Sequence, residues 1–144
     1  MSKKLRGYVS STFINGNIIP QRVQNLVIRN YASLNNLEYF LSTAEYYMKE
    51  CFMQLNGEIK NLSKLDGMVF YSVHQLPNSL TLAKELIISI LDQGKELHFA
   101  LEEKKICSKE DLAYIENFIL AKSLCLKKLP MDVAKHMTSS IVWE

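Results

Sequence analysis

The chain has 144 residues, of which 48% are hydrophobic and 22% are charged, and its formal net charge is +2. This length suits one domain that buries about 70% of its unfolded surface. The small charge and the scattered lysines predict that no nucleic acid is bound. No apolar run approaches the roughly 20 residues that cross a bilayer, and no apolar signal segment follows the N-terminal lysines. We therefore expect a cytoplasmic protein.

The cysteines give no sign of a metal centre or a disulfide framework. Cys51, Cys107 and Cys125 are odd in number and lack the CxxC spacing of zinc sites. No glycine-rich phosphate loop is present either, since Asn15-Gly-Asn17 has one glycine and no lysine after it. We expect no bound metal and no cofactor.

Strand-like and helix-like segments alternate from the N-terminus onward. A short strand is predicted over residues 5–10, and a polar loop follows it. Pro20 suits the first turn of a helix, and apolar residues repeat at helical spacing from Val23 to Leu34. The pair Asn35-Asn36 favours the left-handed backbone that ends many helices. The first unit is therefore a strand followed by a helix.

The same alternation continues through the middle of the chain. A strand is predicted over 37–42, a helix over 47–63 and a third strand over 68–73. The third strand is continuously apolar, which is typical of a strand covered on both faces. Asn78 or Ser79 is expected to cap the next helix, which would extend to Gly94.

The last elements complete a single α/β domain over residues 1–129. A fourth strand is predicted over 97–101, and Ser108 with Asp111 forms a capping box for a long final helix. The order predicts a mainly parallel four-stranded sheet with helices on both faces and a C-terminal tail over 130–144. The apolar arc of the final helix is too wide for one sheet contact, so the tail or a second subunit covers it. Of these two, we favour a homodimer.

Parallel strands bring their carboxyl ends to one edge of the sheet, where α/β proteins usually bind ligands. The N-terminus of the first helix points to the same edge and favours an anion such as phosphate. The side chains expected at this edge, or on the first helix beside it, are Ser10, Ser11, Asn15, Asn17, Gln21, Gln24, Arg29, Glu45, Ser72, His74 and Gln75.

Three of these residues are candidates for catalysis. The ordinary pKa of histidine, about 6.5, suits an acid or base at neutral pH, and His74 is the only histidine predicted at this edge. Ser10 and Ser11 are candidate nucleophiles or phosphate ligands, which require a base within hydrogen-bond reach. The alternatives stay open: loop serines that bond nearby backbone groups, and a structural His74. His98 alternates with apolar residues and is predicted to lie at the edge of the core.

One resemblance concerns the fold. Gly7-Tyr-Val-Ser-Ser11, with Gln21, Gln24 and the stretch 66–79, resembles the catalytic domain of serine recombinases over roughly residues 5–103. That family opens with Tyr-x-Arg-Val-Ser, whose serine is the nucleophile, and carries two arginines after its third strand. This chain lacks the first arginine and has Gln75 and Asn78 at the later two positions. Because those arginines neutralise the attacked phosphate, the resemblance implies the fold and not DNA strand transfer.

A second resemblance spans nearly the whole domain. Residues 6–11, 16–17, 19–29, 45–46, 66–77 and 97–102 are similar to the small bacterial "sporadic carbohydrate cluster" family. Its members are encoded in surface-polysaccharide biosynthesis clusters. The resemblance implies that setting and no particular reaction.

These observations give a leading hypothesis and two rivals. The first is a protein of surface-polysaccharide synthesis that binds, and in one version modifies, a sugar phosphate or nucleotide sugar. The serines and Gln21 and Gln24 would hold the phosphate, while Glu45, His74 and Gln75 would face the sugar. The main rival is a non-catalytic interaction module that partners a glycosyltransferase or another pathway enzyme. A DNA-binding regulator is the third, and the small net charge disfavours it. Whether the protein is an enzyme stays open.

Overall fold

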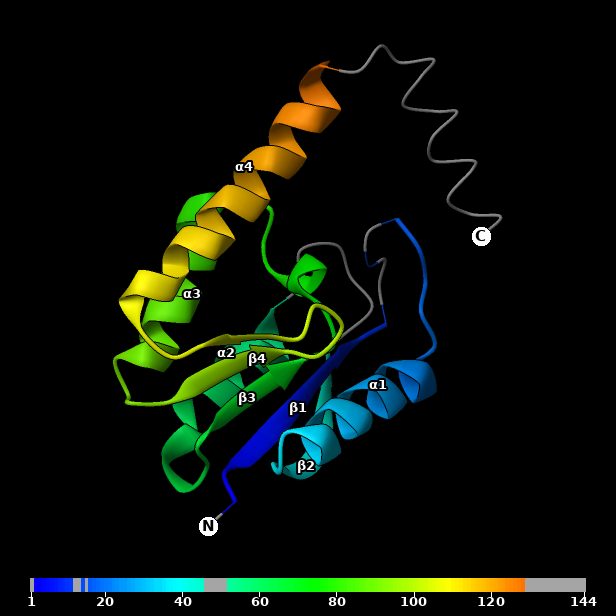
Figure 1. The fold of residues 1–144 in the computed structure, drawn as a ribbon, viewed down its shortest axis with the longest axis vertical. Helices are drawn as coiled ribbons and strands as arrows, with labels where there is room; N and C mark the ends of the chain where they lie inside the picture. The colour runs from blue at the N-terminus through cyan, green and yellow to red at the C-terminus, as the bar shows by residue number, and fades with distance from the viewer. Residues whose placement is uncertain (1, 12–13, 15, 46–51, 129–144) are drawn as a thin grey trace.

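The computed structural model describes residues 2–11, 14, 16–45 and 52–128, which form one sheet with helices on both faces (Figure 1). The strand order is β2-β1-β3-β4-β5. The first four strands of the chain run parallel, and β5 is antiparallel to β4. The prediction of a mainly parallel α/β domain is confirmed, although the sheet has five strands and not four.

The first crossover follows the predicted order closely. Strand β1 (Lys4–Ser10) leads to helix α1 (Gln21–Leu34), and strand β2 (Glu38–Glu45) lies beside β1. Pro20 is the residue just before the helix, and Asn36 has the left-handed backbone with a φ of 56°. The proline and the asparagine pair therefore mark the two ends of α1, as the sequence predicts.

The second and third crossovers differ from the prediction at their boundaries. Helix α2 (Met53–Lys60) ends earlier than expected, and a short 3-10 turn, η1 (Leu62–Lys64), follows it. Residues 46–51, where the predicted helix begins, lie outside the described residues. Strand β3 (Gly67–Phe70) is shorter than predicted, because the chain turns at η2 (Val73–Gln75). Ser79 is the cap of helix α3 (Leu80–Leu91).

Strand β4 (Glu96–Phe99) is followed by the strand that the sequence does not predict. β5 (Lys104–Ile106) has three residues, two of them lysines, and pairs only with β4. Short charged strands are typical of sheet edges, because they discourage pairing with other chains, but they carry no apolar pattern to recognise. The Ser108–Asp111 capping box is confirmed, and it encloses the 3-10 turn η3 (Lys109–Asp111) ahead of helix α4 (Leu112–Lys128).

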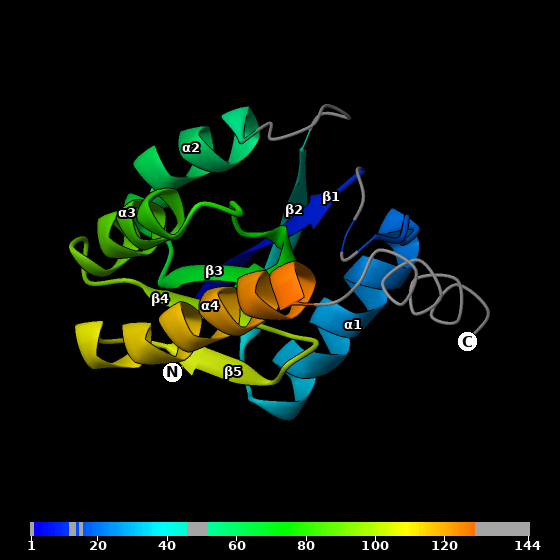
Figure 2. The same ribbon diagram turned by 90° about the horizontal axis from the view of Figure 1, so that it is seen from above.

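The core has two layers, one on each face of the sheet (Figure 2). Helix α1 covers one face, where its Ile28 and Tyr31 pack with Leu5 and Val9 of β1. Helices α2, α3 and α4 supply the other layer, which contains the aromatic residues Tyr8, Phe70 and Phe99. No helix in the described part of the chain combines the length and apolarity needed to cross a membrane.

Helix α4 begins against the core and then extends beyond the sheet (Figure 1). Ile115 is fully buried, whereas Leu120 and Leu124 are 55% and 43% exposed. The apolar arc is therefore wider than the contact that the described residues provide. The homodimer stays a prediction, and the predicted tail over 130–144 lies outside the described residues.

Candidate functional site

The carboxyl ends of the parallel strands meet at one edge of the sheet. Tyr8 of β1 lies opposite Phe70 of β3, and Phe70 lies opposite Phe99 of β4. The chain leaves each strand within a few residues of these positions, so the segments that start at Ser10, Ser72 and Ala100 come together there. The edge predicted from the order of elements is therefore present.

Ser10 is enclosed by two glutamine side chains. Its backbone N–H donates to Oε1 of Gln24 at 2.9 Å, and Nε2 of Gln24 donates back to the Ser10 carbonyl at 2.8 Å. The same Nε2 donates to the carbonyl of Ile19, also at 2.8 Å. Gln75 Nε2 donates to the Ser10 hydroxyl at 2.8 Å. Ser10 is 5% exposed and Gln24 is fully buried, so these amides stabilise the β1–α1 connection.

A second hydrogen-bonded group adjoins the first and shares Gln75 with it. Ser72, which is fully buried, donates from its hydroxyl to Oε2 of Glu102 at 2.7 Å, and the Val73 N–H donates to Oε1 at 3.0 Å. The Ser72 N–H donates to Oε1 of Gln75 at 3.1 Å. Glu102 therefore holds the η2 turn in place.

His74 lies beside these groups and faces helix α4. Its ring meets the ring of Phe118 edge-on, with centroids 5.0 Å apart and planes at 68°. Its Nδ1 is buried and has no hydrogen-bond partner among the described residues. Burial lowers the pKa of His74 below its ordinary value, and the positive charge of Lys122 lowers it further, against the opposing effect of Glu102. The imidazole is therefore neutral at pH 7.

No described hydrogen bond joins Ser10 to His74. Within the described part of the chain, the hydrogen bonds of the Ser10 side chain and backbone run to Gln24 and Gln75. Ser11 lies at the rim of the edge, where its hydroxyl accepts from Nε2 of Gln21 at 2.6 Å. The triad-like grouping of a serine with His74 is therefore not assembled around Ser10.

The other predicted ligand residues lie in different parts of the molecule, and some of them lie outside the described residues. Arg29 lies on α1 eight residues after Gln21, about 12 Å along the helix axis, with its guanidinium 5.9 Å from the centre of the Tyr39 ring. Asn17 closes a small backbone bridge with Ile14. Glu45 lies opposite Ser10 in the strand register, and its side chain and the whole of Asn15 lie outside the described residues. The described residues include no cluster of three metal-ligating side chains.

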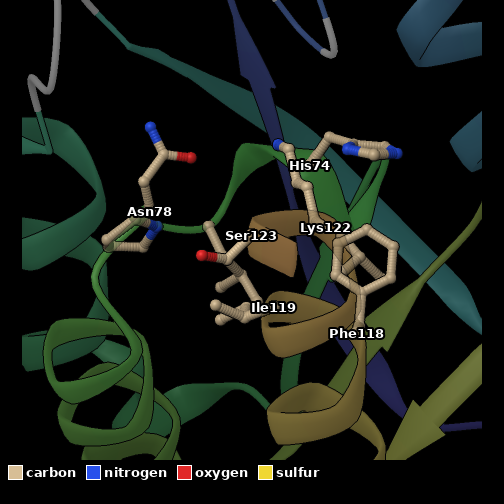
Figure 3. A pocket seen from close by; sticks show the side chains of 9 residues that line it. His74, Asn78, Phe118, Ile119, Lys122 and Ser123 are labelled. Atoms are coloured by element: carbon tan, nitrogen blue, oxygen red, sulfur yellow. The ribbon is translucent and has the colours of Figure 1, made fainter. Parts of the chain in front are cut away.

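A cavity of about 310 Å³ lies between the η2 segment and α4 (Figure 3). We call it the α4 cavity, and its walls are Val73, His74, Leu76, Pro77, Asn78, Phe118, Ile119, Lys122 and Ser123. In Figure 3, His74 and Lys122 lie at one end, and Asn78 lies on the opposite side. Sequence reasoning found the loop side through His74 and missed the helix side. The strand-edge rule concerns loops that follow strands and gives no weight to residues in the middle of a later helix.

Two solved structures with a similar fold come from a site-specific recombinase and an integrase. The chain matches the crystal structure of a resolvase family site-specific recombinase from Streptococcus pneumoniae with a TM-score of 0.61 and 10% identity, over 95% of this chain and 96% of that one. It matches the N-terminal catalytic domain of TP901-1 integrase with a TM-score of 0.57 and 13% identity, over 85% and 97%. No protein-family model and no curated protein sequence matches the chain.

These neighbours contradict the functional part of the sequence interpretation. The predicted sugar-phosphate or nucleotide-sugar ligand, the role in surface-polysaccharide synthesis and the rival module for a glycosyltransferase were wrong, because the neighbours are recombinase and integrase domains. The exclusion of nucleic acid was wrong for the same reason. A small net charge is a sum over the whole surface and says little about one face. The similarity to the carbohydrate-cluster family is not confirmed, whereas the resolvase-like fold is.

Proposed function

We propose that this chain is a cytoplasmic resolvase-fold protein that binds DNA without cutting it. The structural neighbours are a site-specific recombinase and an integrase, and both are matched over nearly their whole length. The sequence around Gly7–Ser11 and 66–79 resembles the same class. Support for binding comes from this shared fold and from the cations of α1, and support for the absence of cutting comes from the environment of Ser10.

The environment of Ser10 carries the second half of the proposal. A serine that attacks a phosphodiester needs a base to take its proton and positive groups to stabilise the phosphate. The Ser10 hydroxyl instead accepts a hydrogen bond from the neutral amide of Gln75 and is 5% exposed. An amide N–H cannot remove the hydroxyl proton, and it carries no net charge. Ser10 is therefore a structural residue in this proposal.

The rim of the edge and the outer face of α1 supply the DNA contacts. Ser11 and Gln21 are partly exposed at the start of α1, where free backbone N–H groups favour a phosphate. Arg22 and Arg29 are exposed and seven residues apart, so they lie on the same side of the helix, about 10 Å from each other along its axis. Two phosphate contacts from these arginines would give a slope of about −2 in log K against log salt.

The test measures binding and cleavage in the same preparation. Fluorescence anisotropy with a labelled duplex, across a salt series, should show binding that weakens with salt. The double variant Arg22→Gln/Arg29→Gln should lose most of the slope, while Lys105→Gln, which removes an exposed charge from β5, should keep it. Absence of binding at low salt, or equal slopes in both variants, would overturn the proposed DNA contact.

Supercoiled plasmid tests whether the protein cuts. We expect no nicked product and no protein–DNA adduct that survives denaturing electrophoresis. The assignment of Ser10, Ser11 and His74 as catalytic residues stays a prediction, and this experiment tests it. An adduct that disappears in Ser10→Ala and persists in Ser11→Ala would make Ser10 the nucleophile and would refute the non-cutting proposal.

A further inference from the structure

We propose that the α4 cavity is a binding site for a small organic carboxylate with an apolar body. The site shares no residue with the proposed DNA contacts, since those lie on α1 and at Ser11 and the cavity lies between η2 and α4. Its volume of about 310 Å³ is at the lower end of the roughly 300–1,000 Å³ typical of ligand pockets.

Most of the cavity wall is apolar. Val73, Leu76 and Pro77 come from the loop side, and Phe118 and Ile119 come from α4. The three loop residues are buried, whereas Phe118 and Ile119 remain partly exposed although they pack against the core. A ligand that covers these two side chains would remove apolar surface from water, which favours binding. An aromatic or branched aliphatic body fits this wall.

One end of the cavity is polar and unsatisfied. Nδ1 of His74 is buried and has no hydrogen-bond partner among the described residues. Buried polar atoms in folded proteins are nearly always paired with protein, water or ligand, so an unpaired one requires an explanation. Figure 3 shows that the His74 ring lies beside the Lys122 side chain at this end. A ligand group placed there would meet Lys122 directly, and it would reach Nδ1 of His74 after a small shift of the ring, because that atom is buried.

Lys122 gives that end a positive charge, whereas the carboxylate of Glu102, which also acts on His74, is held by hydrogen bonds from Ser72 and Val73. Lys122 is partly buried, lines the cavity and forms no ion pair with any residue that the structure describes. His74 beside it is held neutral by burial and by the lysine, so it offers a hydrogen bond without adding charge. A carboxylate has two oxygens and one negative charge, and it can therefore accept from His74 and from Lys122 together.

The rest of the lining makes a carboxylate a better match than a phosphate monoester. Apart from Lys122, the polar side chains around the cavity are His74, Asn78 and Ser123, which carry no charge at neutral pH. A doubly charged phosphate would lose much of its hydration against a mainly apolar wall and would meet one cation. A singly charged acid with an apolar body loses less and gains the contacts with Phe118 and Ile119.

Isothermal titration of the full chain with 3-phenylpropionate tests the site, with 3-phenylpropan-1-ol as a neutral probe of the same shape. The acid should bind saturably and at least about tenfold more tightly than the alcohol, the range expected for a charge-assisted hydrogen bond. Lys122→Met should remove that preference, and Lys105→Met should leave it unchanged. This comparison of probes in the unaltered protein needs no variant, so a folding defect in Lys122→Met does not prevent the test.

Two further measurements locate the bound acid. Ser123→Phe, which fills the cavity without changing its charge, should abolish binding of both probes, and the NMR signals of the Ile119 methyl groups should shift on titration of the acid. Equal affinity for acid and alcohol, no saturable binding of the acid, or methyl shifts that persist in Ser123→Phe would each overturn the proposal. Loss of plasmid or duplex binding would bear only on the DNA function, because the acid is tested without nucleic acid.

Discussion

Replacing Gln24 with leucine should destabilise the fold more than any exposed polar substitution. The side chain is fully buried and makes three hydrogen bonds with backbone groups, two at Ser10 and one at Ile19. Leucine has a similar volume, so it removes these bonds and leaves the Ser10 N–H without its partner. An unpaired buried donor costs about 1–3 kcal/mol, and each carbonyl that loses a donor adds a smaller amount. Removing the buried amide itself offsets part of this cost.

The net loss should be about 3 kcal/mol in the free energy of unfolding, or roughly 10 °C in melting temperature for a domain of this size. Urea denaturation followed by circular dichroism at pH 7.5 measures it, with an unchanged slope as the sign of two-state unfolding. Gln93→Leu is the matched control, because Gln93 also donates to two backbone carbonyls, at Ile59 and Ser89, but its side chain is exposed. That variant should lose under about 1 kcal/mol. Equal losses in the two variants would refute the structural role assigned to Gln24.

Other consequences concern packing, pH and assembly. Gly57→Ala should stabilise α2 by about 0.5–1 kcal/mol, because no atom lies close to the new methyl group. Gly67→Ala should prevent normal folding, because its Cβ would collide with the backbone of Glu96 in β4. Thermal melts of the two variants distinguish a raised melting temperature from a lost transition. Burial lowers the pKa of His98 and of His74, so protonation of either favours the unfolded chain. Stability should be full above about pH 6.5 and fall as the pH drops below it. His98→Phe should reduce this slope in a profile of urea midpoints and leave the part due to His74, and an unchanged slope would contradict the contribution of His98. The predicted homodimer contact on α4 is tested with the double variant Leu120→Glu/Leu124→Glu, which should be a folded monomer by light scattering and should still show a cooperative thermal transition. A monomeric wild-type protein would refute the homodimer prediction.

The sequence predicts the boundaries of those helices whose ends are set by nearby residues. Pro20 and Asn36 bound α1, and Ser108 with Asp111 sets the turn before α4, because each acts within a few residues of itself. β5 is different, since its pairing with β4 is the only feature that makes it a strand. The strand 68–73 was predicted too long because an apolar run does not show where the hydrogen-bonded ladder ends. Burial of Tyr71 and Val73 outside β3 accounts for the extra apolar residues.

The predicted edge of the sheet is present, whereas the roles assigned to its side chains stay predictions. Gln24 and Gln75 were expected to face a ligand, and the structure turns both amides inward onto backbone and Ser10. A polar side chain at the edge of a sheet can bind a ligand or form hydrogen bonds within the protein, and only the surrounding packing decides between these two roles. The α4 cavity shows the same limit, since Lys122 lies 48 residues after His74 in the sequence and reaches it only through tertiary packing.

Gln75 supplies the physical reason behind the proposal that this chain does not cut DNA. It donates to the Ser10 hydroxyl and accepts from the Ser72 N–H, so one neutral side chain joins β1 to the η2 turn. Arginine, which the serine recombinases carry in this element, has donors and no acceptor, and in this buried position it would need a carboxylate or phosphate partner. The glutamine satisfies its neighbours without any ligand. The edge of the sheet therefore holds its own loop in this chain, and that loop forms one wall of the α4 cavity.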